Sequence, residues 1–517
     1  MRSDQLILRD MFRRALERFG DRAAITAPDG SLSYEELLAK ATVLAGALQA
    51  RGIEAGDRVV FLLRNSVHYV IADVAVMLVG ACKVPLNDML AADDVGYMIG
   101  HSDAKAVIAH TSFLSTLAAI ESTVESVGVR LAVIDTDIPL PGFETVSFES
   151  DGGRYSADTR IDGDDPGLII YTGGTTGRPK GVYHTQQSLA VNFMSHLINA
   201  EIAHDEHLLI CSPLPHSAQQ FVLAALLRGA RVTIETGFDA DRVLQLIAEE
   251  RVTWMFMVPT MIYRLLDAPA LAGTDTSSLR TIVYGASPIT SARLQQALQR
   301  FGAVFLQIYG QTEIPNLVTT LSKADHEQAK YQTSCGQPVI FCDVVIRDEE
   351  GSAVEIGNAG EITVRSFYTL ERYHADPERT DAAYVGEYLR TGDIGYQAPT
   401  GHIYLVDRAK DMIISGGMNV YSTEVENVIQ EVDGVGQVVV IGVPDDDWGE
   451  AVTAFVIPNG TALDGQAVIT HCKSQLAKYK VPKRVELVTE IPLTAYGKPD
   501  KKALRARFWS DEARQIN

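Results

Sequence analysis

A loop rich in glycine and threonine has the residue types that binding of a phosphate group needs. Residues 168–182 read LIIYTGGTTGRPKGV, in which an apolar strand is followed by Thr172, Gly173, Gly174, Thr175, Thr176, Gly177 and Lys180. Glycines let backbone N–H groups turn toward an anion, and threonine hydroxyls add donors. This order predicts a phosphate-binding loop. It is not the Walker pattern, because Lys180 precedes the last glycine and no Ser or Thr follows it. The alternative is a plain turn.

The size and charge of the chain limit the classes of protein to which it can belong. Its 517 residues exceed what one hydrophobic core organises, so two or more domains are expected. The net charge is 45 − 66 = −21, which argues against nucleic acid or an anionic membrane as the main partner. An anionic substrate would then need a local site rich in basic or amide groups.

Cysteine usage and the first residues predict a cytoplasmic protein. The five cysteines are scattered and form no C-x-x-C pair, so we expect reduced thiols rather than a disulfide frame or a zinc site. Residues 1–20 lack the apolar segment of a signal peptide. The most apolar run, residues 70–82, contains Asp73 and is too short to span a bilayer. No membrane insertion is expected, and a monomer and a homodimer are both compatible with these features.

Apolar runs with strand spacing alternate with segments of helical spacing along most of the chain. The expected strands cover residues 59–63, 106–109, 131–134, 208–211, 232–235, 281–284 and 304–308. The expected helices cover residues 66–79, 240–249 and 291–301. Such alternation is the signature of α/β layering with largely parallel sheets. The acidic stretch 149–167 is expected to be an exposed loop before the phosphate strand.

The pattern changes from about Tyr404 onward. A polar junction at 407–411 precedes a glycine loop and a helix in which Thr423 and Glu426 have capping-box spacing. This helix is followed by two more strands and a last helix, over residues 438–443, 451–457 and 466–477.

We therefore predict an α/β protein with two parts. Residues 1–409 would form a large N-terminal domain of several subdomains with layered sheets and helices. Residues 411–517 are enough for a small α+β domain, with the boundary at Lys410.

Seven short motifs occur in one order along the chain. They are the loop at 171–181, Pro213-Leu214-Pro215-His216, Tyr284-Gly285-Ala286-Ser287-Pro288, Tyr309-Gly310-Gln311-Thr312-Glu313, Thr391-Gly392-Asp393, Asp407-Arg408 and Tyr496-Gly497-Lys498. Their order and spacing resemble the adenylate-forming superfamily, in particular its acyl- and aryl-CoA ligase branch, over nearly the whole chain. Each motif alone has a plain structural explanation, but chance is a poor explanation of the full series.

The resemblance implies a two-step reaction that uses ATP, Mg²⁺ and CoA. A carboxylate attacks ATP to give an acyl-adenylate and pyrophosphate, and a thiol then displaces AMP. Because an anionic carboxylate approaches an anionic α-phosphate, the site must supply positive charge and oriented donors. The resemblance implies that the loop from Thr172 to Gly177 holds the β- and γ-phosphates. Thr312 would contact the α-phosphate, and Glu313 would bind Mg²⁺, which prefers carboxylate and phosphate oxygens.

The same resemblance places the nucleoside. Asp393 would accept hydrogen bonds from the two ribose hydroxyls, with Arg408 as a donor beside it. Tyr309 would stack on adenine. The other residues that the resemblance implies at the nucleotide are Lys180, Gly285, Ala286, Ser287, Gly310 and Gln311.

Lys498 matches the late catalytic lysine of the superfamily. An ammonium at this position can bridge the carboxylate and the α-phosphate as they approach each other. The family pattern has Ser or Thr before the glycine, whereas this chain has Tyr496. Taken alone, Lys498 could be a surface lysine, Glu313 a solvated acid and Asp393 a turn residue.

The resemblance also implies that the C-terminal domain is mobile, with a hinge at Lys410. Lys498 would enter the site for adenylation, and Gly416 and Gly417 would then line a thiol tunnel, where glycine lets the acceptor pass close to the backbone. The segment around Trp448 resembles the one in 4-chlorobenzoate-CoA ligase in which a tryptophan packs on the pantetheine of CoA. A β-turn and a partly buried tryptophan are the plain alternatives.

The resemblance implies that the acid lies in a pocket formed by His216, Gln220, Ala286, Ile314 and Pro315. Relatives that activate amino acids place an Asp in the segment 213–221 to pair with the ammonium group. Here the segment reads PLPHSAQQF and has no acid, so an α-amino acid is not the expected substrate. The lining favours a bulky, mostly apolar acid of aryl, medium-chain or polycyclic type. Gly173 in place of the usual Ser is shared with some aryl-acid activators.

CoA is the favoured acceptor because no carrier-protein or condensation module is attached to the chain. A stand-alone adenylation enzyme that loads a carrier protein and a luciferase-like oxygenase are alternatives with the same first step. A nucleotide-binding module without activity is disfavoured because Lys498 and Glu313 are both present.

Overall fold

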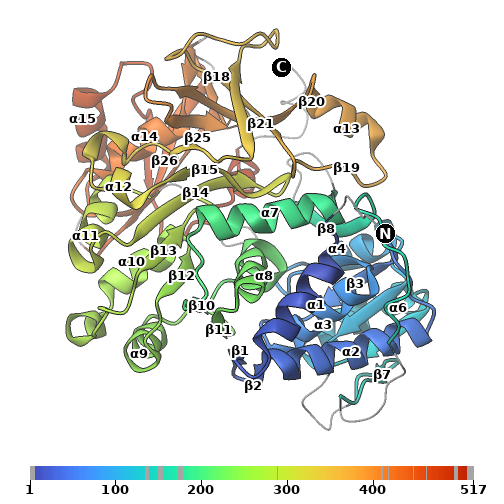
Figure 1. Ribbon diagram of the computed structural model, residues 1–517. Coiled ribbons are helices and arrows are strands. Elements are labelled where there is room, and N and C mark those ends of the chain that lie inside the picture. Colours follow the sequence, from blue (N-terminus) through green and yellow to red (C-terminus); the bar gives the residue numbers. More distant parts are fainter. Residues whose placement is uncertain are drawn as a thin grey trace.

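The computed structural model describes residues 6–133, 139–148, 155–172, 178–287, 289–408, 411–416, 418–445, 447–460, 463–493 and 499–508. Within these ranges the strands form four sheets, which we call A to D, and most helices pack against them (Figure 1). Sheets A, B and C lie in the N-terminal part and sheet D in the C-terminal part. This arrangement confirms the predicted α/β class with a small α+β domain at the C-terminus.

Sheet B joins the early strands to the strand before the predicted phosphate loop. Its order is β19 (Arg372–Tyr373), β9 (Lys180–Thr185), β8 (Pro166–Thr172), β4 (Cys82–Pro85), β3 (Arg58–Leu62), β5 (Ala106–Ala109), β6 (Val129–Ala132) and β7 (Glu144–Thr145). Neighbouring strands from β8 to β7 in this order pair parallel, whereas β9 pairs antiparallel with both β8 and β19 at one edge. The β8–β9 hairpin pairs Thr172 with Lys180, so the predicted loop connects two neighbouring strands.

Sheet A contains the strands whose ends carry most of the other motifs. Its order is β16 (Gln337–Pro338), β15 (Ile314–Leu321), β14 (Phe305–Gln311), β13 (Thr281–Tyr284), β12 (Trp254–Met257), β10 (His207–Ile210), β11 (Arg231–Ile234), β1 (Ala23–Ala27) and β2 (Gly30–Ser33). The strands from β14 to β1 in this order are parallel, and β2, β15 and β16 are antiparallel additions at the two edges.

One hydrophobic core fills the space between sheets A and B. It contains residues of α1 (Leu8–Phe19), α2 (Tyr34–Ala50), α3 (Val67–Val79), α7 (Gln186–Asn199) and α8 (Gln219–Arg228). Figure 1 shows α1, α3, α7 and α8 gathered in the middle of the N-terminal part. Every residue of α3 is buried, and two of its polar residues, His68 and Asp73, are each paired with a charged side chain.

The outer faces of the two sheets carry the remaining helices of this part. Sheet B is covered by α4 (Ala92–His101), α5 (Leu114–Ala119) and α6 (Glu121–Glu125). Sheet A is covered by α9 (Ala240–Glu250), α10 (Pro259–Asp267) and α11 (Ser291–Phe301). Sheets A and B therefore form the layered architecture that the alternation of strands and helices predicts.

A buried ion pair connects sheet B to the central helices. Lys83 Nζ on β4 lies 2.5 Å from Asp73 Oδ1 on α3 and 2.7 Å from Gln219 Oε1 at the start of α8. Burial lowers the pKa of Lys83 and raises the pKa of Asp73, because each charge loses hydration, while the attraction between them opposes both shifts. Since loss of either partner would leave an uncompensated buried charge, the pair fixes β4, α3 and α8 relative to one another.

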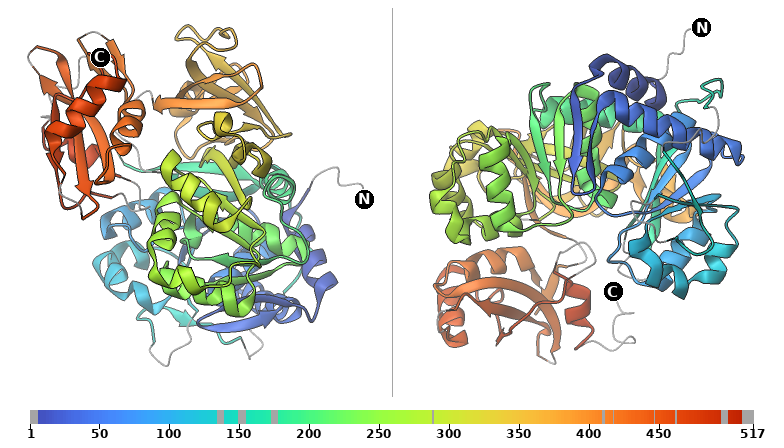
Figure 2. Two further views of the ribbon diagram at one scale, coloured as in Figure 1. Left: turned by 90° about the vertical axis from the view of Figure 1, so that its left-hand side faces the viewer. Right: turned by 90° about the horizontal axis from the view of Figure 1, so that it is seen from below.

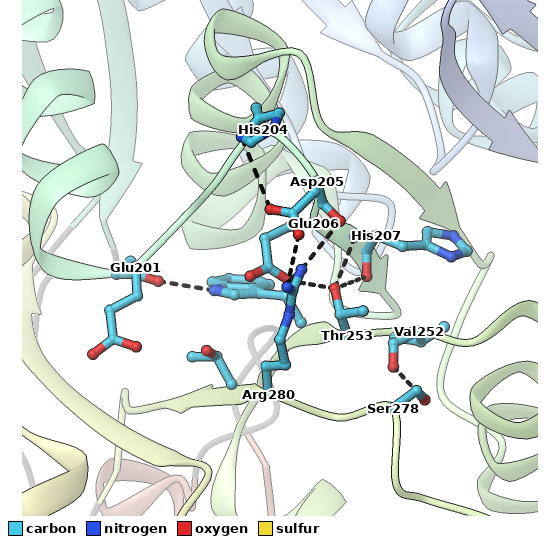
Figure 3. Close-up of polar contacts among 12 residues, drawn as sticks. Glu201, His204, Asp205, Glu206, His207, Val252, Thr253, Ser278 and Arg280 are labelled. Carbon is cyan, nitrogen blue, oxygen red and sulfur yellow. Dashed lines mark hydrogen bonds and ion pairs between the residues drawn. The ribbon is translucent and has the colours of Figure 1, made fainter.

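Polar contacts tie together the amino ends of three strands of sheet A (Figure 3). Arg280, before β13, lies 2.8 Å from Asp205 Oδ2 and 3.0 Å from Glu206 Oε2, both before β10. Thr253, before β12, donates a hydrogen bond to the buried Glu206 carboxylate. These contacts stabilise the amino ends of the strands. The loops that could bind a ligand follow the carboxyl ends of the same strands, at the other edge of the sheet.

Sheet C is antiparallel throughout and departs from the expectation of largely parallel sheets. It contains β17 (Cys342–Arg347), β18 (Gly360–Ser366), β20 (Tyr384–Val385), β21 (Tyr388–Gln397) and β22 (Ile403–Arg408). No helix separates β17 from β18 or β21 from β22, so the crossovers that reveal parallel strands are absent from these connections. Two short helices, α12 (Lys323–His326) and α13 (Pro377–Ala382), lie in the connections before β16 and β20.

Sheet D and its helices form the C-terminal part, which Figure 2 shows in orange and red beside the rest of the chain. The sheet contains β24 (Met418–Val420), β23 (Ile413–Ser415), β26 (Gly449–Pro458), β25 (Val435–Asp445) and β27 (Arg484–Leu487). The helices are α14 (Ser422–Gln430), α15 (Gly465–Gln475) and α16 (Lys501–Arg505). The two long strands and the two longer helices occur where the sequence predicts them.

The predicted capping box at Thr423 and Glu426 is wrong. Helix α14 begins at Ser422, its N-cap is Tyr421, and the Tyr421 side chain makes no capping hydrogen bond. The Glu426 carboxylate instead accepts a hydrogen bond of 2.8 Å from the backbone N–H of Val440 on β25. A tertiary partner has therefore replaced the local one that the spacing suggested.

None of the helices in the described ranges combines the length and the apolar character needed to cross a membrane.

Candidate active site

The carboxyl edge of sheet A opens into a cavity of about 2170 Å³. Residues that follow β12, β13 and β14 line it, and so do residues before α8 and in the β8–β9 hairpin. Parallel strands deliver their following loops to one edge of a sheet, so motifs far apart in the sequence meet there. Residues from the C-terminal part, among them Ile414, Glu450 and Lys501, also line the cavity.

A tyrosine, a glutamine and an aspartate form one hydrogen-bonded corner of this cavity. Tyr309 Oη and Gln311 Nε2 on β14 each donate to Asp393 Oδ2 on β21 at 2.7 Å. Burial, followed by the neighbouring Asp393 carboxylate, raises the pKa of Tyr309 well above its usual value, so the phenol keeps the proton that it donates. Asp393 is 4 % exposed, and its backbone lies opposite that of Arg408 in the antiparallel pairing of β21 with β22. It is therefore no turn residue, and the corner joins sheet A to sheet C.

The residues after β14 stand beside the phosphate hairpin. Lys180 Nζ lies 3.2 Å from Glu313 Oε1 and donates to Tyr373 Oη at 2.7 Å, and Tyr373 donates to Glu313 at 2.8 Å. Burial and the Glu313 carboxylate raise the pKa of Tyr373. A cation and a carboxylate thus face the cavity together, which suits an anionic ligand and its counter-ion.

Of the predicted phosphate-binding segment Thr172–Gly177, the structure describes Thr172, which ends strand β8 and borders the cavity. Its Oγ1 is buried and has no hydrogen-bond partner within the described residues. An unpaired buried hydroxyl is costly, so this donor is available to a ligand. The predicted residues Gly173, Gly174, Thr175, Thr176 and Gly177 lie outside the described ranges.

Two of the predicted glycines have a packing reason for lacking a side chain. A Cβ at Gly310 would come within 2.4 Å of the Asn316 carbonyl carbon, and one at Gly285 within 2.6 Å of the Ile308 carbonyl oxygen. Gly310 lines the cavity, whereas Gly285 is not among the described residues that do. Close approach of strands β13, β14 and β15 therefore accounts for both glycines.

The predicted acyl pocket is partly assembled as expected. His216, Gln220, Ala286 and Pro315 line the cavity, and Ser287 lies beside them. Ile314 does not line it in the described structure, because it is fully buried in the cluster around Tyr309 and Val318. Asn316 takes its place, since a left-handed backbone (φ 65°) breaks the alternation of the strand and lets Asn316 line the cavity beside Pro315.

Buried histidines hold two of these segments in place. His184 on β9 donates from Nε2 to the Thr312 carbonyl at 2.9 Å. His196 on α7 accepts at Nε2 from Asn316 Nδ2 at 3.1 Å, and the same Asn316 amide donates to the Ser217 carbonyl at 3.0 Å. Burial lowers the pKa of each histidine to about 4, so both are neutral near pH 7. No sequence motif indicates these two histidines, although each is a polar residue within an apolar run.

Asn65 supports the segment that carries His216. Its Nδ2 donates to the carbonyls of Ser212 and Glu235, and its Oδ1 accepts from the Leu214 N–H at 2.8 Å. One amide thus connects the loops after β3, β10 and β11. No motif pointed to it, because its partners are backbone groups far away in the sequence.

Two of the predicted tunnel residues, Gly416 and Trp448, lie together in the C-terminal part. Gly416 has φ 60° and donates its N–H to the Trp448 carbonyl at 2.7 Å, and the Trp448 ring lies 4.1 Å from Lys483 Nζ. Gly449, next to Trp448, lines the cavity. Lys410, Gly417 and Lys498 lie outside the described ranges.

The segments next to these residues are anchored by ion pairs. Arg505 of α16 lies 2.8 Å from Asp411, and Lys501 lies 2.8 Å from Glu426 and donates to Ser422 Oγ at 2.7 Å. Helix α16, which follows the predicted catalytic lysine, is therefore attached to the residue that follows the predicted hinge.

Comparison with known families decides the class. The family model described as AMP-binding enzyme matches residues 12–374, and the model of the AMP-binding enzyme C-terminal domain matches residues 424–498. The chain belongs to the AMP-binding enzyme family. Within this family it is an AMP-forming acid–thiol ligase of the acyl-CoA synthetase type, in line with the curated relatives that follow.

Two of these relatives are CoA ligases by name. The chain is 35 % identical to the medium/long-chain-fatty-acid–CoA ligase FadD8 of Mycobacterium tuberculosis, over 97 % of this chain and 90 % of that protein. It is 36 % identical to a feruloyl-CoA synthase of Amycolatopsis sp, over 92 % and 94 % of the two chains.

Solved structures share the whole fold. The amide bond synthetase McbA of Marinactinospora thermotolerans matches with a TM-score of 0.89 and 33 % identity over 97 % of this chain and 100 % of that one. ATP-bound MatB of Rhodopseudomonas palustris matches with a TM-score of 0.86 and 29 % identity over 96 % and 98 % of the two chains. The family and this ATP-bound structure together support ATP as the nucleotide.

The buried histidines predict how stability depends on pH. The folded pKa of His184, about 4, is below the ordinary value of about 6.5, so the unfolded chain takes up the proton first. The stability that His184 contributes is complete above pH 6.5 and is lost as the pH falls toward 4. The free energy of unfolding is measured with urea at pH 7, 6 and 5. Its decrease with falling pH should be smaller in His184→Gln than in the wild type, by up to about 1.4 kcal/mol per pH unit.

The matched control for this measurement is His204→Gln, since that imidazole is 66 % exposed. The control should keep the wild-type dependence on pH. The same dependence in His184→Gln and wild type would contradict the assignment of a neutral, buried His184.

Proposed function

We propose that the protein activates a bulky, mostly apolar carboxylic acid with ATP and transfers the acyl group to CoA. The observation that carries this proposal is the continuity of one cavity. It is lined by the Tyr309–Gln311–Asp393 corner, by Lys180 with Glu313, and by the pocket around Gln220. An acid held in that pocket could direct its carboxylate toward a nucleotide held by the corner.

In the first half-reaction, a carboxylate oxygen of the acid would attack the α-phosphorus of ATP while the bond to the β-phosphate oxygen breaks. Asp393, with two donors already on Oδ2, would accept from ribose hydroxyls through its remaining acceptor sites. Thr172 and the glycine loop would hold the departing pyrophosphate, and Thr312 and Lys498 would stabilise charge on the α-phosphate. Tyr309, with its hydroxyl fixed on Asp393, would present its ring to adenine.

The carboxylate of Glu313 fits a Mg²⁺ ligand, because it lies beside the phosphate hairpin and a hard cation prefers such oxygens. The ion would supply charge neutralisation on the phosphates. Lys180 lies 3.2 Å from this carboxylate, so the lysine would balance the charge of Glu313 before the nucleotide binds. This role matches its place in the hairpin.

In the second half-reaction, the sulfur of the thiol would attack the acyl carbon of the adenylate, and AMP would leave as the thiol loses its proton. We propose that residues 411–517 rotate about Lys410 between the two steps. Lys498 would withdraw, and Gly416 and Gly417 would border the path of the thiol. Trp448, as in 4-chlorobenzoate-CoA ligase, would pack on pantetheine, which supports CoA as the acceptor.

The relatives differ in acid and in acceptor. Their names include a fatty acid–CoA ligase, a feruloyl-CoA synthase and an amide bond synthetase. The apolar lining near Gln220, with Phe256 and Ile308, supports an aryl or medium-chain acid. Transfer to a carrier protein, to an amine or to oxygen would share the adenylation step and would need a different acceptor.

An acid panel tests the proposal. The full-length protein is incubated with Mg·ATP and aryl, medium-chain and polycyclic acids, and adenylates are trapped with hydroxylamine while pyrophosphate release is measured. We expect turnover with at least one class and thioester formation when CoA is added. Absence of pyrophosphate release with every acid would contradict the proposal. If product forms with an amine or a phosphopantetheinylated carrier protein but not with CoA, the proposed acceptor is wrong.

The role of Lys498 can be separated by half-reaction. Lys498→Ala should lower the rate of adenylate formation by about 100-fold or more, since a charge-stabilising group on the α-phosphate is lost. Transfer from a supplied acyl-adenylate to CoA should change little. Lys473→Ala, an exposed lysine on α15, is the matched control. Equal loss of both half-reactions in Lys498→Ala would remove the proposed role.

A further inference from the structure

Two consecutive glutamines at the start of α8 are both buried, and they differ in their partners. Gln219 and Gln220 are each 2 % exposed. The amide oxygen of Gln219 accepts from Lys83 Nζ at 2.7 Å and from Tyr69 Oη at 3.1 Å. The buried ion pair of the core therefore fixes the first turn of α8, and with it the backbone position of Gln220.

The Gln220 amide has no protein partner in the described part of the chain. Neither its Oε1 nor its Nε2 makes a hydrogen bond there, although solvent hardly reaches either atom. A primary amide offers two N–H donors and a carbonyl oxygen with two lone pairs. Buried groups of this kind are nearly always satisfied, so an unpaired amide at this position calls for a partner from outside the protein.

The surroundings of Gln220 identify where that partner would come from. Gln220 borders the cavity together with Phe256, Ile308 and Pro315, which are apolar. Its neighbour Phe221 is fully buried against Phe256, with ring centroids 4.8 Å apart, so α8 is held in the core. The amide nitrogen of the nearby Asn316 donates to His196 and Ser217. Gln220 is therefore an unpaired amide beside apolar side chains, in a wall that also includes the polar residues His216 and Ser217.

We propose that Gln220 binds a hydroxyl or carbonyl group on the body of the substrate acid and so selects a polar-substituted acid over its plain hydrocarbon analogue. This inference rests on the proposed function and specifies the substrate class of that site. A hydroxyl can donate to Oε1 and accept from Nε2, which matches what the amide lacks. Hydrogen bonds in water-poor surroundings discriminate strongly, because the analogue without the group leaves the amide unpaired.

Pairs of acids with one skeleton test the inference. Each pair consists of an acid with and without a ring hydroxyl, or of a medium-chain acid with and without a terminal hydroxyl or an oxo group, and kcat/KM is measured by pyrophosphate release. The wild type should favour the substituted member of at least one pair by about tenfold or more. Gln220→Met, which keeps the side-chain volume, should lose that preference, mainly because kcat/KM for the substituted acid falls.

Gln245→Met is the matched control, since Gln245 is exposed on α9, and it should keep the preference. Thermal unfolding adds a readout that is independent of activity: Gln220→Met should be as stable as the wild type or more stable, because no protein hydrogen bond is lost. A clearly lower unfolding temperature would show that the amide is satisfied within the protein and would overturn the inference.

The kinetic outcomes separate the two proposals. Turnover without preference in every pair overturns the role of Gln220 and leaves the proposed function intact. An equal loss for both members of a pair in Gln220→Met would mean that the amide binds the reacting carboxylate, which also overturns it. No pyrophosphate release from any acid would reject the proposed function and, with it, this inference.

Discussion

The parallel arrangement of the central strands of sheet A is the constraint on which the site depends. All of these strands point their carboxyl ends to one edge, so the segments after β10, β12, β13 and β14 must meet there. The opposite edge is held by Arg280, Glu206 and Thr253, which contact one another and do not line this cavity. Because the strands are parallel, one edge of the sheet carries the structural contacts and the other edge carries the loops that line the cavity.

Buried polar groups then set the positions of the loops at this edge. Lys83 and Asp73 connect sheet B to α3 and α8, and the His196–Asn316–Ser217 chain connects α7 to the wall of the acyl pocket. Such groups are costly to bury unless they are paired. The paired groups also restrict the loops to few alternative arrangements. The mostly apolar pocket wall therefore has hydrogen-bonding groups at defined positions. Two buried groups without a hydrogen-bond partner in the described residues, the Gln220 amide and the Thr172 hydroxyl, belong to residues that border the cavity.

Features that depend on neighbouring residues, such as strands, helices and short motifs, could be predicted from the sequence. Contacts between segments far apart in the chain could not. The strand 281–284 and the helix 291–301 occur at the predicted residues as β13 and α11, because hydrophobic periodicity is a local signal. The capping box at Thr423 failed because Glu426 has a hydrogen-bond partner on β25. The parallel expectation failed in sheet C, where no helix separates β17 from β18 or β21 from β22.

The same limit applies to the site. The motifs indicated Tyr309, Gln311 and Asp393 as nucleotide residues, but not that both β14 side chains donate to one oxygen of Asp393. His184 and Asn65 escaped prediction because their partners are backbone carbonyls and N–H groups of other segments. Ile314 was expected in the pocket, and the positive φ of Asn316 put Asn316 there instead. Asparagine adopts this conformation more readily than most residues, but its residue type alone does not show at which asparagine the chain will do so.

The most direct test of the account is the affinity for nucleotide at the corner that joins sheets A and C. Binding of Mg·ATP is measured by calorimetry for the wild type, for Asp393→Asn and for Asp343→Asn, an exposed carboxylate of sheet C as the control. A hydrogen bond to a charged group is worth about 1.5–3 kcal/mol, so Asp393→Asn should bind about 10- to 100-fold more weakly, with the control unchanged. Equal affinity of all three folded proteins would contradict the placement of the nucleotide at Asp393.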